Sequence, residues 1–179
     1  MTEYEAIVYD LDGTLVDLDV DWGRVTEDVR TVYEDAGRES PDGDLWELLS
    51  RADEAGVRSD VEATIAAHEC EGARTAPRLA LADDLIERSI PVGVCSLNCE
   101  QACRIALEEH GLADAVEVVV GRDTVTTRKP DPEPLLEAVG GLEAAPEETV
   151  FVGDSRRDEV TARRAGTAFE YVRAVTREE

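Results

Sequence analysis

Two aspartates near the start of the chain, Asp10 and Asp12, carry the clearest sign of chemistry. They follow the apolar run Ala6–Tyr9 and precede Gly13, a residue that permits a tight turn. Side chains two residues apart on an extended backbone point the same way, so both carboxylates are expected to leave the end of a strand together. One aspartate can then attack an electrophile while the other carries a proton.

Lys129 is the second such feature, because it is the one lysine among 18 Lys and Arg residues. It lies in the Pro-rich segment Arg128–Pro132. Arginine, a bulky planar fork, replaces a compact ammonium poorly where one point charge must bridge an aspartate and an anion. Lysine at this position therefore indicates a need for an ammonium group.

Two further groups follow later apolar runs: Ser96 with Asn98, and Asp154 with Asp158. The two aspartates are four residues apart at a predicted helix start, where carboxylates share one face and are favoured by the helix's positive end. Together with Asp10 they would crowd three negative groups into one pocket. Such a group needs a counter-charge, and Mg²⁺ prefers oxygen ligands.

A bound Mg²⁺ and Lys129 could together neutralise an anionic substrate, while the Ser96 hydroxyl and turn amides hold its oxygens. Phosphate is the substrate group that fits this set of residues.

The elements that must position these residues alternate along the chain. Five apolar runs are predicted as strands: Ala6–Asp10, Pro91–Ser96, Val116–Gly121, Thr149–Asp154 and Ala168–Val172. Four helices are predicted between these strands: Ala76–Arg88, Asn98–His110, Pro132–Val139 and Arg156–Ala165. This alternation indicates an α/β fold with a doubly wound parallel sheet, in which ligands bind at the carboxyl ends of the strands.

The connection after the first strand is different, because it holds no strand pattern but three helical stretches: Trp22–Ala36, Asp44–Ala55 and Ser59–Gly72. We predict a helical cap over residues 16–76, inserted into a core made of residues 1–15 and 77–179. Its arginines Arg24, Arg51 and Arg74 are candidate ligands for a second anionic group, with surface ion pairs as the alternative. Its tryptophans Trp22 and Trp46 are expected to be cap core.

Four groups, taken in chain order, resemble the motifs of the haloacid dehalogenase superfamily. They are Asp10-Leu11-Asp12-Gly13-Thr14, Ser96, Lys129 and Gly153-Asp154-Ser155-Arg156-Arg157-Asp158. The resemblance extends over the whole chain and is strongest to the phosphoglycolate phosphatase and β-phosphoglucomutase branch.

The resemblance implies a Rossmann-like core and a phosphatase that forms an aspartyl-phosphate on Asp10. It implies Asp12 as the acid toward the leaving alcohol and then the base toward water. It further implies Mg²⁺ held by Asp10, the Asp12 backbone carbonyl and Asp154, with Asp158 in the outer shell, and a phosphoryl group held by Ser96, Lys129 and, less specifically, Asn98.

Three other functions remain open at this point. A phosphomutase keeps the same four motifs and differs only in what accepts the phosphoryl group. A dehalogenase lacks the second carboxylate, because a halide needs no proton to leave, and Asp12 therefore disfavours it. A phosphate-binding or signalling relative without catalysis would bind the same group and not turn it over.

The whole composition bears on location and partners. Asp and Glu number 42, and the formal net charge is −24, spread along the chain. This is typical of the solvated acidic surface of a halophile's protein, with binding of a basic partner as the alternative. The sequence has no Lys/Arg stripe of the kind that binds nucleic acid, and no apolar stretch approaches the ~18 residues of a membrane span. We expect a cytoplasmic monomer or homodimer that binds a small phosphorylated metabolite.

Overall fold

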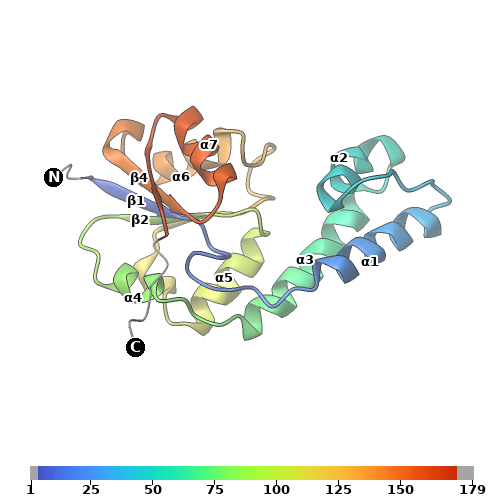
Figure 1. Cartoon of the computed structure of the whole chain (residues 1–179), viewed down its shortest axis with the longest axis horizontal. Coiled ribbons are helices and arrows are strands. Elements are labelled where there is room, and N and C mark those ends of the chain that lie inside the picture. The colour runs from blue at the N-terminus through green and yellow to red at the C-terminus, as the bar shows by residue number, and fades with distance from the viewer. Residues whose placement is uncertain (1–3, 173–179) are drawn as a thin grey trace.

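The computed structural model describes residues 4–172 and contains a five-stranded parallel sheet in the order β3-β2-β1-β4-β5. The strands are β1 Ala6–Tyr9, β2 Val92–Cys95, β3 Val118–Val120, β4 Thr149–Gly153 and β5 Ala168–Tyr171. Helices lie on both faces of this sheet (Figure 1). The predicted doubly wound α/β fold is confirmed.

The alternating side chains of β1, the central strand, connect the two halves of the core. Ile7 and Tyr9 pack in one apolar cluster with α4 (Leu81–Ile86) and α5 (Glu100–Glu109). Ala6 and Val8 pack in the other with α6 (Glu133–Gly141) and α7 (Arg156–Ala165). A strand buried on both faces is typical of a parallel sheet covered by helices. Two short 3₁₀ helices complete the core, Ala113–Ala115 and Pro146–Glu148.

The helix predicted over Ala76–Arg88 is wrong at its start, because α4 begins only at Leu81. The preceding residues are extended instead and pair with the segment that follows β1. The Leu79 amide donates to the Leu15 carbonyl at 2.9 Å, and the Asp17 amide donates to the Pro77 carbonyl at 2.9 Å. These tertiary bonds replace the hydrogen bonds of a first helical turn.

Three helices occupy the predicted cap: α1 Trp22–Asp35, α2 Leu45–Ala55 and α3 Arg58–Thr75. They surround an apolar cluster of their own, inside which the Tyr33 hydroxyl donates to the Leu48 carbonyl at 2.6 Å. The three predicted helical stretches are confirmed, while the cap boundaries at 15/16 and 76/77 stay a prediction.

The helix α3 is the long element that connects cap and core. It extends from the cap helices to α5, against which its carboxyl half lies (Figure 1). Gly72 lets the chain entering the cap cross this helix, since a Cβ there would be 2.6 Å from the Asp19 carbonyl oxygen. The cap is therefore connected to the core by the packing of α3 against α5, as well as by the two places where the chain enters and leaves the cap.

Over residues 4–172, the structure has no helix that combines the length and the apolar character needed to cross a membrane.

Candidate active site

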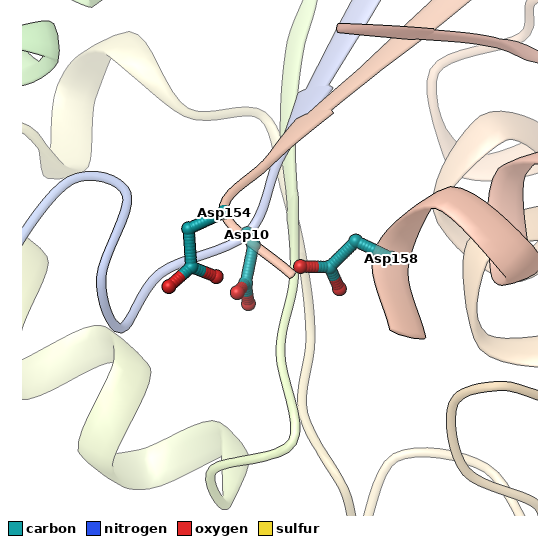
Figure 2. A group of neighbouring side chains, drawn as sticks. All are labelled: Asp10, Asp154 and Asp158. Carbon is teal, nitrogen blue, oxygen red and sulfur yellow. The ribbon is translucent and has the colours of Figure 1, made fainter. Parts of the chain in front are cut away.

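Three carboxylates meet at the carboxyl ends of the central strands. Asp10 follows β1, Asp154 follows β4, and Asp158 lies in the first turn of α7; each offers an oxygen, and these oxygens lie within 4.8 Å of one another. Figure 2 shows the three side chains, from separate segments, turned toward the same space. The fold thus concentrates negative charge at one point.

Lys129 is the cation that balances this charge. Its side chain is buried, and its Nζ donates to Asp158 Oδ1 at 2.6 Å, to Asp10 Oδ1 at 3.0 Å and to the Cys95 carbonyl at 3.2 Å. Burial would lower the pKa of Lys129, but the two carboxylates outweigh it and raise the pKa, so the side chain stays an ammonium. One point charge bridges two acids here, and its expected contact with an anionic substrate stays a prediction.

Asp10 has a strongly altered acidity. Burial raises its pKa from 3.8 to about 7; the Lys129 ammonium opposes this rise and the Asp158 carboxylate adds to it. A buried carboxylate that is only partly compensated attracts further positive charge, whether a proton or a metal ion.

Asp12 faces the same cavity as Asp10 but stands apart from the carboxylate cluster. Its Oδ1 accepts a hydrogen bond from the Leu18 amide at 2.8 Å, and burial raises its pKa. The turn that follows Asp12 depends on Gly13, whose φ is +77°. A Cβ at Gly13 would lie 2.2 Å from Asp154 Oδ2, so only glycine lets these segments approach.

Asp158 is engaged on both of its oxygens. Oδ1 accepts from Lys129, and Oδ2 accepts from the Ser155 hydroxyl at 2.7 Å and the Ser155 amide at 3.3 Å, which closes a capping box at the start of α7. Asp158 is thereby suited to holding Lys129, while Asp10 and Asp154 have the orientation and oxygen chemistry that suit a hard divalent cation. The outer-shell role expected for Asp158 stays a prediction.

Ser96 and Asn98 lie on the loop after β2 and are both buried. The Ser96 hydroxyl donates to Asn98 Oδ1 at 2.9 Å and accepts from the Asn98 amide at 3.1 Å. The two predicted phosphate ligands thus bond to each other in this structure. For Ser96 to donate to a phosphoryl oxygen, its hydroxyl must rotate away from Asn98.

A cavity of about 440 Å³ lies beside the clustered carboxylates, and its lining includes Asn98 but not Ser96. Its lining joins core residues with the amino ends of α1 and α2, which contribute Trp22 and Trp46. Both tryptophans also pack against the cap cluster, as the expected cap-core role requires. That expectation did not include their second position, in the lining of the cavity. A larger cavity of about 720 Å³, lined by Tyr9, Arg88 and Tyr171 among others, contains none of the clustered carboxylates.

The arginine near the substrate space is not one of those predicted from the sequence. Arg51 pairs with Glu47 at 2.9 Å and Arg74 with Glu71 at 4.0 Å. None of the three predicted arginines, Arg24 included, lines the 440 Å³ cavity. Arg157, from the first turn of α7, does line it. Its place inside the fourth motif, between Asp154 and Asp158, was the signal that could have identified it.

Comparison with known proteins gives matches at the level of a family. The model of the family described as "Haloacid dehalogenase-like hydrolase" matches residues 73–172. A phosphoglycolate phosphatase of Rhodospirillum rubrum is 44% identical over 88 residues, 49% of this chain and 36% of that protein. The pyrophosphatase PpaX of Oceanobacillus iheyensis is 35% identical over 83 residues, 46% of this chain and 39% of that protein. The matches thus span less than two-fifths of the length of these relatives.

The solved structures agree with the fold. A HAD-superfamily hydrolase from Ehrlichia chaffeensis superimposes with a TM-score of 0.63 and 25% sequence identity, covering 94% of this chain and 87% of that one. Unlike the curated relatives, this neighbour is covered along most of its length, cap included.

Proposed function

Because this chain belongs to the haloacid dehalogenase-like hydrolase family, we propose that it is a Mg²⁺-dependent phosphatase of small phosphomonoesters. One observation carries the proposal: the buried Asp10 carboxylate is held at 3.0 Å by the Lys129 ammonium, and a second acid, Asp12, faces the same cavity. A nucleophile, a phosphate-binding cation and a proton carrier are the three groups that this chemistry needs.

The first half of the reaction transfers the phosphoryl group to the enzyme. An Asp10 oxygen attacks phosphorus, the bond from phosphorus to the ester oxygen breaks, and Asp12 gives its proton to the leaving alcohol. A raised pKa favours the protonated form of Asp12 that this step requires.

The second half regenerates the carboxylate. Asp12, now ionised, takes a proton from a water molecule that attacks phosphorus, the aspartyl-phosphate bond breaks, and inorganic phosphate leaves. Lys129 stays beside the phosphoryl oxygens through both halves, and Asp158 keeps it in place.

Mg²⁺ would be held by Asp10, the Asp12 backbone carbonyl and Asp154, with Asp158 behind them. When bound, it supplies positive charge that neutralises the phosphoryl oxygens. The oxygen-only donor set and the space kept by Gly13 beside Asp154 suit this ion.

The substrate is proposed to be a small phosphorylated metabolite, since a cavity of about 440 Å³ is within the size range of small-molecule sites. Relatives named phosphoglycolate phosphatase and pyrophosphatase indicate two compounds to test first, phosphoglycolate and pyrophosphate. Sugar phosphates complete the set because the sequence leaves a phosphomutase open.

The test measures phosphate release from phosphoglycolate, pyrophosphate, sugar phosphates, nucleoside monophosphates and p-nitrophenyl phosphate, with Mg²⁺ in molar KCl. Asp10→Asn is the control, because it keeps the size of the side chain and removes the nucleophile. We expect release that disappears in Asp10→Asn and on chelation of Mg²⁺. Transfer between sugar hydroxyls without release would indicate the mutase, and release that persists in Asp10→Asn would contradict the proposal.

A further inference from the structure

A second buried ion pair lies beneath the loop after β2, outside the carboxylate cluster. Its acid is Glu69 on the cap helix α3, and its base is Arg122, after β3 in the core. Arg122 Nη1 donates to Glu69 Oε1 at 2.5 Å, and the two side chains are 2% and 0% exposed. Arg122 Nε also contacts Glu62 Oε2 at 3.1 Å, and Glu62 lies nearer the amino end of α3 than Glu69 does. The predicted site does not use any of these three residues.

The pair supports the loop that carries Ser96 and Asn98. Glu69 Oε2 accepts from the Cys99 backbone amide at 3.0 Å, and Glu69 Oε1 accepts from Asn98 Nδ2 at 3.4 Å. Arg122 donates through its Nη1 to the Leu97 carbonyl at 2.9 Å and through its backbone amide to the Asn98 carbonyl at 2.8 Å. Several backbone and side-chain groups of one short loop thus bond to two residues, Glu69 and Arg122.

Glu69 also determines which way the Asn98 amide points. An ionised carboxylate only accepts hydrogen bonds, so Asn98 must direct its NH₂ group toward Glu69. Its Oδ1 then faces the Ser96 hydroxyl, which donates to it at 2.9 Å. The resting orientation of the Ser96 hydroxyl, from which it must rotate to reach a phosphoryl oxygen, therefore depends through Asn98 on a residue of the cap.

Stability alone does not account for this pair. Burying two charges costs much of what their attraction returns, so a buried ion pair is weak evidence for a stabilising role. Arg122 Nη2 is moreover buried without a hydrogen-bond partner within residues 4–172, and such an unpaired donor is destabilising. The arrangement is better explained by the geometry that it imposes on the loop.

We propose that Glu69 and Arg122 are positioning residues, which hold the loop of Ser96 and Asn98 in the geometry that binds a phosphoryl group. Because Glu69 belongs to α3, the same contact makes phosphate binding depend on how the cap helix sits on the core. The inference rests on the proposed function, since it assigns the loop to a phosphoryl group.

The test compares Glu69→Gln with Glu62→Gln. Both changes remove one negative charge next to Arg122 from the same helix, but Glu62 contacts Arg58 and Arg122 and not the loop. We expect Glu69→Gln to raise the KM of p-nitrophenyl phosphate and the dissociation constant of inorganic phosphate about 10-fold or more, as displaced binding groups do. Glu62→Gln should change both values by less than about 2-fold. Equal effects of the two variants would overturn the inference.

A double variant separates positioning from folding. Replacing both partners, Glu69→Met with Arg122→Met, removes the buried charges together and is often neutral or stabilising. If the pair positions the loop, this variant keeps the melting temperature of the wild type and still binds phosphate weakly. Normal phosphate affinity in the folded double variant would contradict positioning and leave only a structural role.

Calorimetric titration with inorganic phosphate makes the result independent of turnover. If the wild type hydrolyses p-nitrophenyl phosphate through Asp10 and the Glu69 variants bind phosphate normally, this inference fails and the proposed function stands. If the wild type neither hydrolyses the ester nor binds phosphate, the proposed function fails and the inference with it.

Discussion

Lys129 illustrates how one side chain can be specified by its contacts. Its Nζ reaches two carboxylates and a carbonyl from inside the protein, within 3.2 Å of each. A guanidinium presents its donors in a wide plane and cannot be placed at the same point. The survival of a lysine in a chain that otherwise uses arginine has a physical reason in this geometry.

We predict that Lys129→Arg lowers kcat/KM by on the order of 10²-fold, the cost of one misplaced preorganised donor. The variant keeps the charge, so the loss would measure geometry. Arg104→Lys, on the exposed face of α5, is the matched exchange and should leave the rate unchanged. Turnover of Lys129→Arg within about 3-fold of wild type would mean that a point charge is not required.

The raised pKa of Asp10 predicts a pH-dependent stability. Without metal, the folded protein holds a proton on Asp10 up to about pH 7, while the unfolded chain loses it near 3.8. The stability linked to this group is complete below the lower value and is lost as pH rises through the higher one. The Asp10→Asn variant cannot ionise at this position, so it does not lose stability in this way as pH rises.

The measurement is thermal unfolding of wild type and Asp10→Asn in a chelator, between about pH 5 and about pH 8. We expect the free energy of unfolding of Asp10→Asn to rise by a few kcal/mol relative to that of the wild type as pH rises. Added Mg²⁺ should reduce this difference, because it favours the ionised aspartate of the wild type. A difference that stays constant with pH would show that Asp10 keeps an ordinary pKa.

At the scale of elements, the cap and core are connected next to Lys129. Arg128, in the core loop before Lys129, donates through Nη2 to the Trp46 carbonyl at 3.2 Å and to the Ser50 hydroxyl, both on α2. Its guanidinium also lies 5.8 Å from the centre of the Trp46 ring. The cap thus contacts the segment that carries the Lys129 ammonium.

Arg128→Met should loosen this contact and raise KM about 3- to 10-fold, the effect of losing a partly exposed charged contact. The kcat should fall less, because Lys129 keeps its own partners. Arg104→Met, which removes an exposed arginine from α5, serves as the control. If KM is unchanged while the melting temperature falls, Arg128 stabilises the cap without closing it over substrate.

For the whole molecule, charge is the dominant property. A net charge of −24 would repel the proposed phosphorylated substrate at long range, and Lys129 and the proposed metal ion would oppose this repulsion at the site. Salt shortens the range of the repulsion, to a Debye length of about 3 Å at 1 M.

We therefore predict that kcat/KM rises as KCl approaches molar concentration. The measurement is steady-state kinetics with p-nitrophenyl phosphate across a KCl series, with circular dichroism at each concentration to confirm the fold. A decrease of kcat/KM over a range in which the fold is intact would contradict the prediction.

The sequence by itself determined the parts of this protein that rest on local patterns. Apolar runs and turn residues identified all five strands, and the spacing of Asp10, Asp12, Lys129 and Asp154 at strand ends indicated one site. These signals are readable because parallel strands bring their carboxyl ends to one edge of a sheet, whatever the rest of the chain does.

Tertiary structure alone decided the remainder. The late start of α4 depends on backbone bonds to residues about sixty positions earlier in the chain. Glu69 and Arg122 are 53 residues apart, and nothing in the local sequence of either indicates the other. Arg128 likewise meets Ser50 from 78 residues away. Such contacts depend on where the cap packs, and packing is a property of surfaces brought together by the whole fold rather than of any segment.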